Sequence, residues 1–265
     1  MNHRNKFGED MYESAICTEL AVHRKVTEAL CDSCPYLLPL LDVYHDVDST
    51  TMVLPGLMPD LLTVCMQRKF SEDEAREVVR QLALALAALH AIGIAHCDVK
   101  PENLALCPRH GHMVLFDFGL ALTDVSPPRV VKGKVRGTVA FLSPEVLRDH
   151  LYSGAADMWV LGAVLYVMLT QSYPFRDPRA TCQVRYNIDY VRQCSGGGGQ
   201  DQGQCSSQLL QLLEVLFVMD PVRRASAHDV LAHPWLGQGG GGGRVEGGSS
   251  ACEVEGIQGN NCLAA

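Results

Sequence analysis

A long helical pattern that runs directly into a short stretch crowded with reactive side chains is the feature that most constrains this chain. In residues 70–94 (FSEDEAREVVRQLALALAALHAIGI), Ser71 precedes three acids and an apolar face at helical spacing, which predicts a helix with a serine cap. Residues 93–106 (GIAHCDVKPENLAL) then bring together His, Cys, two acids, Lys and Asn. The helix therefore ends at a polar loop that is a candidate site.

The order His96, Cys97, Asp98 in this loop suggests a thiol nucleophile with its base. Such a triad needs the three groups adjacent in space, whereas neighbours in sequence usually point apart. We therefore do not interpret Cys97 as a nucleophile.

Composition limits the class of protein. The chain has 265 residues, 47% of them hydrophobic, and a net charge of −8, which allows a sizeable core but disfavours binding to nucleic acid or to an anionic membrane surface. The apolar run at residues 159–170 is too short to span a bilayer, and it predicts a buried helix.

Eleven cysteines without regular spacing do not resemble a disulfide framework. We expect reduced thiols and therefore an intracellular protein, of the cytoplasm or the nucleus. We also expect the protein to be a monomer.

Further elements are expected on both sides of the loop. Residues 12–30 predict an amphipathic helix that carries Glu19, and residues 36–56 predict two short strands separated by a turn. Residues 104–106 and 113–116 predict a hairpin, residues 154–170 and 206–219 predict helices, and a last short helix begins at Ser226. Glycine-rich residues 195–207 predict a flexible insertion, and residues 237–265 predict a disordered tail.

Four more motifs follow the loop: DFGLAL at 117–122, GTVAFLSPE at 137–145, DMWVLG at 157–162 and DPVRRAS at 220–226. In this order the five motifs resemble those of the eukaryotic protein kinases, over roughly residues 15–236. The resemblance implies an α+β, protein-kinase-like fold with a mostly helical large lobe. It divides the chain into an N-terminal stub (1–11), a partial small lobe (12–55), a large lobe (56–236) and the tail (237–265).

The same resemblance implies a chemistry and its residues. Asp98 matches the acid that accepts the proton of the substrate hydroxyl, and Lys100 matches the lysine that steadies the γ-phosphate in serine/threonine kinases. Asn103 and Asp117 match the ligands of Mg²⁺, a cation that prefers oxygen. The implied cofactors are ATP and Mg²⁺, and the implied partner is a protein substrate with a Ser or Thr acceptor.

Three further matches concern the support of the loop. Thr138 resembles the threonine that contacts both the acid Asp98 and the lysine Lys100. Glu145 and Arg224 resemble the ion pair that fixes the end of the activation segment, the stretch between the DFG and SPE motifs, to the large lobe. Asp157 would hold the backbone of the loop from below.

The small lobe departs from the family. Glu19 is the best match for the acid that pairs with a strand lysine, but Gly8 and Lys6 are the only Gly and Lys before it. The preceding residues are too few for a glycine-rich hairpin and a further strand, and the polar sequence around Lys6 does not favour a buried strand. Two interpretations stay open: a truncated form of a longer active kinase, or a pseudokinase that acts as a scaffold by binding a partner.

The expected nucleotide pocket also departs from the family. Val53 or Met52 falls at its back and Leu54 to Gly56 along its edge, where Pro55 has no N–H to offer adenine.

Two more positions border this pocket. Asp60 falls near the expected ribose, although an acid that begins a helix is an equal interpretation. Ala105 stands where a bulkier residue usually supports the adenine ring, so that a small cavity would weaken nucleotide packing.

Weaker patterns have ordinary alternatives. Zinc ligands are suggested by the pair Cys31 and Cys34 and by the group Cys107, His110 and His112. Neither set has a second pair at ligand spacing, and the alternative is that these are ordinary loop residues. The basic run at 129–137 is interpreted as a solvated loop or as a partner for a phosphate on Thr123 or Ser126.

Cys97 stands where many kinases carry an arginine that binds a phosphorylated activation segment. We therefore predict that activation does not depend on a phosphate docking at position 97.

Overall fold

The computed structural model describes residues 18–30, 33–47, 49–108, 110–125, 130–194 and 205–237. Lys6, Cys31, Ser126, most of the predicted insertion and nearly all of the predicted tail lie outside these residues. The elements below belong to the described part of the chain.

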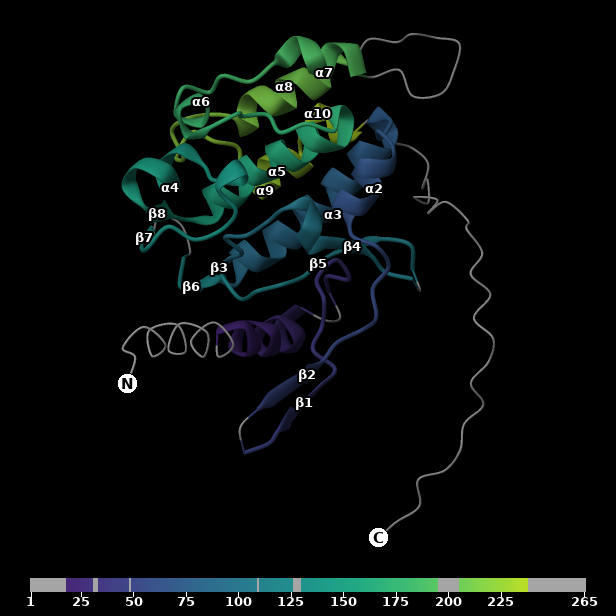
Figure 1. The fold of residues 1–265 in the computed structure, drawn as a ribbon, viewed down its shortest axis with the longest axis vertical. Helices are drawn as coiled ribbons and strands as arrows, with labels where there is room; N and C mark the ends of the chain where they lie inside the picture. The colour runs from purple at the N-terminus through teal and green to yellow at the C-terminus, as the bar shows by residue number, and fades with distance from the viewer. Residues whose placement is uncertain are drawn as a thin grey trace, which may run out of the picture.

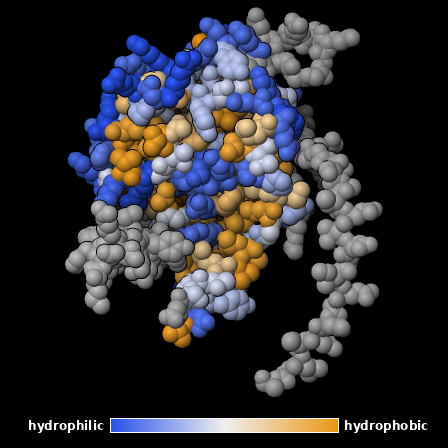
Figure 2. All heavy atoms as spheres, in the orientation of Figure 1, coloured by the Kyte–Doolittle hydropathy of each residue, from blue (hydrophilic) through white to orange (hydrophobic). Residues whose placement is uncertain are grey.

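The smaller part of the described molecule contains the helical residues 18–30 and the hairpin of β1 and β2 (Figure 1). Residues 18–30 are helical, and β1 (Asp42–His45) pairs with β2 (Thr50–Val53) in an antiparallel hairpin. The predicted pair of strands is thus present, and so is the part of the predicted helix from residue 18 onward; residues 12–17 lie outside the described residues. The hairpin exposes Leu41, Tyr44 and Val47, and apolar surface reaches this region in Figure 2.

The larger part is helical (Figure 1). Its helices are α2 (Leu61–Gln67), α3 (Glu72–Ala91), α4 (Pro144–Asp149), α5 (Gly154–Thr170), α6 (Pro178–Cys182), α7 (Ile188–Cys194), α8 (Ser207–Leu216), α9 (Ala227–Leu231) and α10 (Pro234–Gly237). Two 3₁₀ turns, η1 (Pro101–Asn103) and η2 (Val139–Phe141), interrupt its loops. No helix of the described residues is long and apolar enough to cross a membrane.

Short antiparallel strand pairs lie at the boundary between the two parts and along the loops. They are β3 (Ile94–Ala95) with β6 (Leu122–Thr123), β4 (Leu104–Leu106) with β5 (Met113–Leu115), and β7 (Val131–Lys132) with β8 (Leu151–Tyr152). The β4–β5 pair is the hairpin expected from the sequence. Leu115 N–H donates to Tyr36 O at 2.9 Å, which ties this hairpin to the smaller part.

Helices α3 and α5 form the centre of the core. α5 buries residues on all sides, from Ala156 to Thr170, as expected for a helix that is apolar all round. A Cβ at Gly162 would lie 3.0 Å from the Phe217 ring and 3.1 Å from Leu216 Cβ. The glycine therefore allows the end of α8 to pack closely against α5.

The start of α3 is fixed by the predicted cap. Ser71 Oγ accepts the N–H of Glu74, and the Glu74 carboxylate accepts the N–H of Ser71, which is a capping box. The neighbouring Glu72 accepts from Ser206 N at 2.9 Å and from Trp235 Nε1 at 2.7 Å. These contacts join α3 to the starts of α8 and α10 and orient the far end of α3 toward residues 94–98.

Two boundaries differ from the sequence-based expectation. The helix predicted at 206–219 ends at Leu216, because Phe217 leaves the helical path to pack against Trp159 and Phe175 with centroids 5.0 Å away in both cases. The sequence-based prediction placed Ser206 both in the glycine-rich insertion and in the helix. In the structure Ser206 is the N-cap of α8. Helices α4, α6 and α7, of five to seven residues, were not predicted; the equally short α9 was, because Ser226 marks its start.

Candidate active site

Asp157 holds the loop that begins at His96. Its Oδ2 accepts the backbone N–H of His96 and its Oδ1 accepts that of Cys97, both at 2.9 Å. His90, at the end of α3, lies with Nε2 2.9 Å from Oδ2. Burial opposes the charge, but the contact with His90 and the backbone donors lower the pKa of Asp157. A buried carboxylate from α5 therefore fixes the loop through its backbone, as predicted.

Asp98 is the residue on which this loop converges. The side chain is 7% exposed, and its Oδ1 accepts Thr138 N–H at 3.1 Å and the Thr138 hydroxyl at 3.3 Å. Its Oδ2 accepts Lys100 Nζ at 2.6 Å and Asn103 Nδ2 at 3.3 Å. Donors from both sides thus hold the carboxylate in one orientation.

Lys100 and Asn103 complete this cluster. Lys100 Nζ also lies 3.4 Å from Thr138 Oγ1, so Thr138 contacts the acid and the lysine together. Asn103 Nδ2 donates to Asp98 O at 2.9 Å. The amide nitrogen of Asn103 thus faces Asp98. No described residue donates a hydrogen bond to the amide oxygen, which is therefore available to a cation.

Asp117 reaches the same region from the end of β5. Phe116 N–H donates to Asn103 O at 3.1 Å, which links the two predicted metal ligands through the backbone. Asp117 has φ of 66°, a left-handed conformation that is uncommon outside glycine and often marks functional sites. The oxygens of Asn103 and Asp117 are the kind of ligand that Mg²⁺ prefers, so the residues fit the expected ion.

Glu19 faces Asp117 across residue 119. A Cβ at Gly119 would lie 3.3 Å from Asp117 Oδ1 and 3.8 Å from Glu19 Oε2. Burial, and then the charge of Asp117, raise the pKa of Glu19. Glu19 makes no ion pair with Lys or Arg among the described residues, and its nearest basic group is His23 Nε2 at 3.9 Å. Two neighbouring acids without a cation between them indicate a place for positive charge.

Three rings connect Glu19's helix to the loop. His23 packs edge-on against Phe118, with centroids 4.7 Å apart, and Phe118 lies 5.4 Å from His96. His96 is fully buried; its Nδ1 accepts Asp98 N–H at 3.3 Å, so its Nε2 donates to Phe116 O at 3.1 Å. Burial lowers the pKa of His96, and a neutral ring suits this pattern.

The predicted nucleotide-pocket residues lie along the chain between the two parts. Val53 ends β2, Leu54 is half-buried and Gly56 is exposed. Ala105 is buried in β4, and Asp60 forms a β-bridge with it.

The Asp60 carboxylate accepts Thr63 N–H at 2.8 Å and the Thr63 hydroxyl at 3.0 Å. It is therefore the N-cap of α2, the ordinary interpretation of this acid. The ribose contact stays a prediction.

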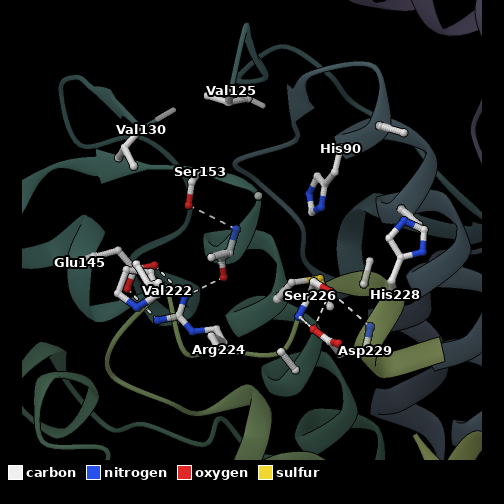
Figure 3. A pocket seen from close by; sticks show the side chains of 18 of the residues that line it. His90, Val125, Val130, Glu145, Ser153, Val222, Arg224, Ser226, His228 and Asp229 are labelled. Atoms are coloured by element: carbon white, nitrogen blue, oxygen red, sulfur yellow. Dashed lines mark hydrogen bonds and ion pairs between the residues drawn. The ribbon is translucent and has the colours of Figure 1, made fainter. Parts of the chain in front are cut away.

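Glu145 and Arg224 form a buried ion pair, with oxygen–nitrogen distances of 2.6 and 2.8 Å (Figure 3). Arg224 also donates to Ala155 O and Val218 O, so α4, α5 and the loop before α9 meet at one guanidinium.

The pair borders a cavity of about 600 Å³. This cavity is lined from α3, α5 and α9 and not by Asp98, Lys100, Asn103 or Asp117. Several polar groups of its lining already have partners: Arg224 with Glu145, His90 with Asp157, and Asp229 with Ser226.

Sequence reasoning missed residues that support the site from a distance. His90, Tyr152 and His23 carried no motif of their own, although His23 follows Glu19 by one helical turn and so shares its face. The group Cys107, His110 and His112 offers no zinc site, because no set of three His, Cys, Asp or Glu in the described ranges could hold a metal. Cys31 lies outside these residues.

Residues 2–236 match the family model of the protein kinase domain. The match covers the whole of the predicted resemblance and begins further toward the N-terminus.

The chain is also similar to named serine/threonine kinases. It is 32% identical over 235 residues to a calcium and calcium/calmodulin-dependent serine/threonine-protein kinase of Lilium longiflorum, covering 84% of this chain and 43% of that protein. It is 37% identical over 191 residues to serine/threonine-protein kinase SRK2F of Arabidopsis thaliana, covering 66% and 50%. The chain thus spans about half the length of the relatives that it matches. On these matches, and with the expected motifs gathered around Asp98, the chain belongs to the eukaryotic protein kinase superfamily, of the serine/threonine type.

Proposed function

We propose that the chain transfers the γ-phosphoryl group of ATP to Ser or Thr hydroxyls of a protein substrate. The observation that carries the proposal is the buried Asp98 carboxylate, held between Thr138 on one oxygen and Lys100 and Asn103 on the other. A carboxylate fixed in this way can orient a hydroxyl and accept its proton.

The residues have distinct roles in this reaction. Asp98 takes the proton as the substrate oxygen bonds to the γ-phosphorus, and the bond to the β–γ bridging oxygen breaks to leave ADP. Lys100 lies beside this position and adds positive charge where negative charge gathers in the transition state. Asn103 and Asp117 would hold Mg²⁺, which supplies charge neutralisation on the phosphate oxygens when bound.

The test is transfer of labelled phosphate from ATP to a general protein substrate by the full chain. Asp98→Asn keeps the size of the side chain and one of its two acceptor oxygens but removes the base, so we expect at least a hundredfold loss of rate. The matched control is Asp189→Asn, an exposed acid on α7 that pairs with Arg192 at 2.7 Å, which should keep the wild-type rate. Undiminished transfer by Asp98→Asn would exclude this mechanism.

The second candidate is a kinase-like scaffold that binds a partner without catalysis. The neighbouring acids Glu19 and Asp117, with no cation between them in the described part of the chain, favour it, since a missing counter-charge weakens nucleotide binding. Melting temperature with ATP and Mg²⁺ separates the two, because a ligand bound by the native state stabilises it. A rise supports the kinase, and no rise at millimolar nucleotide supports the scaffold.

For partners and location we propose the ordinary setting of such an enzyme. The net charge of −8 favours basic protein substrates over nucleic acid. The described cysteines Cys34, Cys65, Cys97, Cys107 and Cys182 are free thiols, which fits an intracellular protein. We also propose that the protein is a monomer.

A further inference from the structure

The segment that carries Thr138 runs alongside β8. Val131 of β7 pairs with Tyr152, and Lys132 pairs with Leu151. Gly133 N–H then donates to His150 O at 3.1 Å. Beyond this point, residues 133–138 form no helix or strand, so their backbone groups need partners from elsewhere.

The Tyr152 side chain supplies those partners. Tyr152 is 1% exposed, and its hydroxyl oxygen accepts Arg136 N–H at 2.7 Å. The same oxygen lies 3.2 Å from Lys134 O and 3.3 Å from Arg136 O, so its proton can go to either carbonyl. The Arg136 guanidinium lies over the ring, 5.8 Å from its centroid. One buried phenol therefore closes this turn of the segment.

The turn leads directly to the proposed base. Gly137, with φ of 91°, sits so close to the loop that a Cβ there would be 2.7 Å from Cys97 O. The next residue, Thr138, donates its N–H and hydroxyl to Asp98. The backbone that Tyr152 binds at Arg136 is thus two residues from the one that holds Asp98.

Cys97 shows why the segment needs this contact. Cys97, Leu142, Val146 and Tyr152 belong to one buried apolar cluster. A thiol in such a cluster cannot bind a phosphate on the segment, because it has no charge and no fork of donors. The segment is therefore fixed by packing and by a neutral hydroxyl.

We propose that Tyr152 is a positioning residue for phosphoryl transfer. Its hydroxyl fixes residues 134–138 so that Thr138 holds the Asp98 carboxylate in place, without a phosphate on the segment. The inference rests on the proposed kinase function and adds to it the means by which the active arrangement is maintained.

The first test is hydrogen exchange of backbone amides in the full chain. Tyr152→Phe removes one oxygen and keeps the ring, and we expect the amides of Arg136 and Thr138 to exchange about tenfold faster. The matched control is Tyr166→Phe, which removes another buried hydroxyl, 3.2 Å from Asn187 O, and should leave these amides unchanged. Unchanged exchange in Tyr152→Phe overturns the proposal, whether or not the chain transfers phosphate.

The second test is kinetic and separates positioning from general stability. Tyr152→Phe should lower kcat roughly tenfold and leave KM for ATP within about twofold. In a Thr138→Ala background its effect should shrink to about threefold, because the two residues act through one path. An undiminished effect in that background overturns the path through Thr138. A wild-type chain that fails to transfer phosphate counts against the proposed function, while the exchange measurement still decides the role of Tyr152.

Discussion

The imidazole of His23 packs edge-on against the ring of Phe118, with the ring centroids 4.7 Å apart. His23 is fully buried, and neither ring nitrogen has a hydrogen bond of ordinary length within the described residues. Burial lowers the pKa of His23 to about 4, although the Leu38 backbone and the Asp117 charge favour the proton. At neutral pH the ring is therefore an uncharged part of the core that joins Glu19's helix to the site.

This pKa makes stability depend on pH in a defined window. Unfolded His23 takes up a proton below its ordinary pKa of 6.5, whereas the folded protein takes it up only near 4. The unfolded state binds more protons between these values, so the free energy of unfolding falls as pH falls through them, by about 3 kcal/mol in total from this group. Urea unfolding of wild type and His23→Leu across the window measures the difference. A pH dependence equal in both proteins would contradict the assignment.

The Glu145–Arg224 pair should be costly to break. Glu145→Gln leaves the Arg224 guanidinium buried without a counter-charge, and we expect the free energy of unfolding to fall by about 3–5 kcal/mol. Asp149→Asn is the control, since Asp149 and Arg148 form an exposed pair at 3.9 Å of the kind that contributes about 1 kcal/mol or less. Equal effects in the two variants, measured by chemical denaturation, would show that burial of the pair does not matter.

Gly137 should tolerate no side chain. Gly137→Ala places a Cβ 2.7 Å from Cys97 O at a φ of 91°, so we expect a loss of about 1–3 kcal/mol in stability and a lower transfer rate. Gly133→Ala in the same segment meets only Arg136 Nη2, at 3.6 Å, and should behave as wild type. Melting temperatures and transfer rates of both variants check this, and a neutral Gly137→Ala would argue against the close contact.

Activity should not depend on a phosphate near Cys97. Burial raises the pKa of Cys97 well above its ordinary value, so residue 97 is a neutral thiol that cannot pair with an anion. Treatment with a general phosphatase should leave the transfer rate within about twofold. A large gain on phosphorylation of the segment that disappears in Cys97→Ser would be the opposite result.

Local features of the fold could be predicted because they depend on neighbouring residues. The Ser71 cap, the extent of α5 from Gly154 to Thr170 and the β4–β5 hairpin were all present as expected. The grouping of Asp98, Lys100 and Asn103 could also be predicted, since a single short loop carries all three. Their catalytic roles remain predictions.

Contacts between distant segments could not be predicted where the family resemblance supplied no match for the residues. His90 and Asp157 are 67 positions apart, and no pattern around either residue indicates that the ends of α3 and α5 meet. The contact of Tyr152 with Arg136 depends on the path of a segment without periodic structure. Asp60 could be interpreted from the sequence in two ways, and the structure shows the one that depends on neighbouring residues, the helix cap with Thr63.

Asp157 binds the loop by accepting hydrogen bonds from two backbone N–H groups, those of His96 and Cys97. These two bonds do not involve the side chains of either residue. The side chain at position 97 takes no part in these two contacts, which anchor the loop of the proposed base Asp98. Anchoring of the loop and contact with the segment therefore depend on different atoms of the same residue: the backbone N–H of Cys97 serves the first, and its side chain, packed with Leu142, Val146 and Tyr152, serves the second.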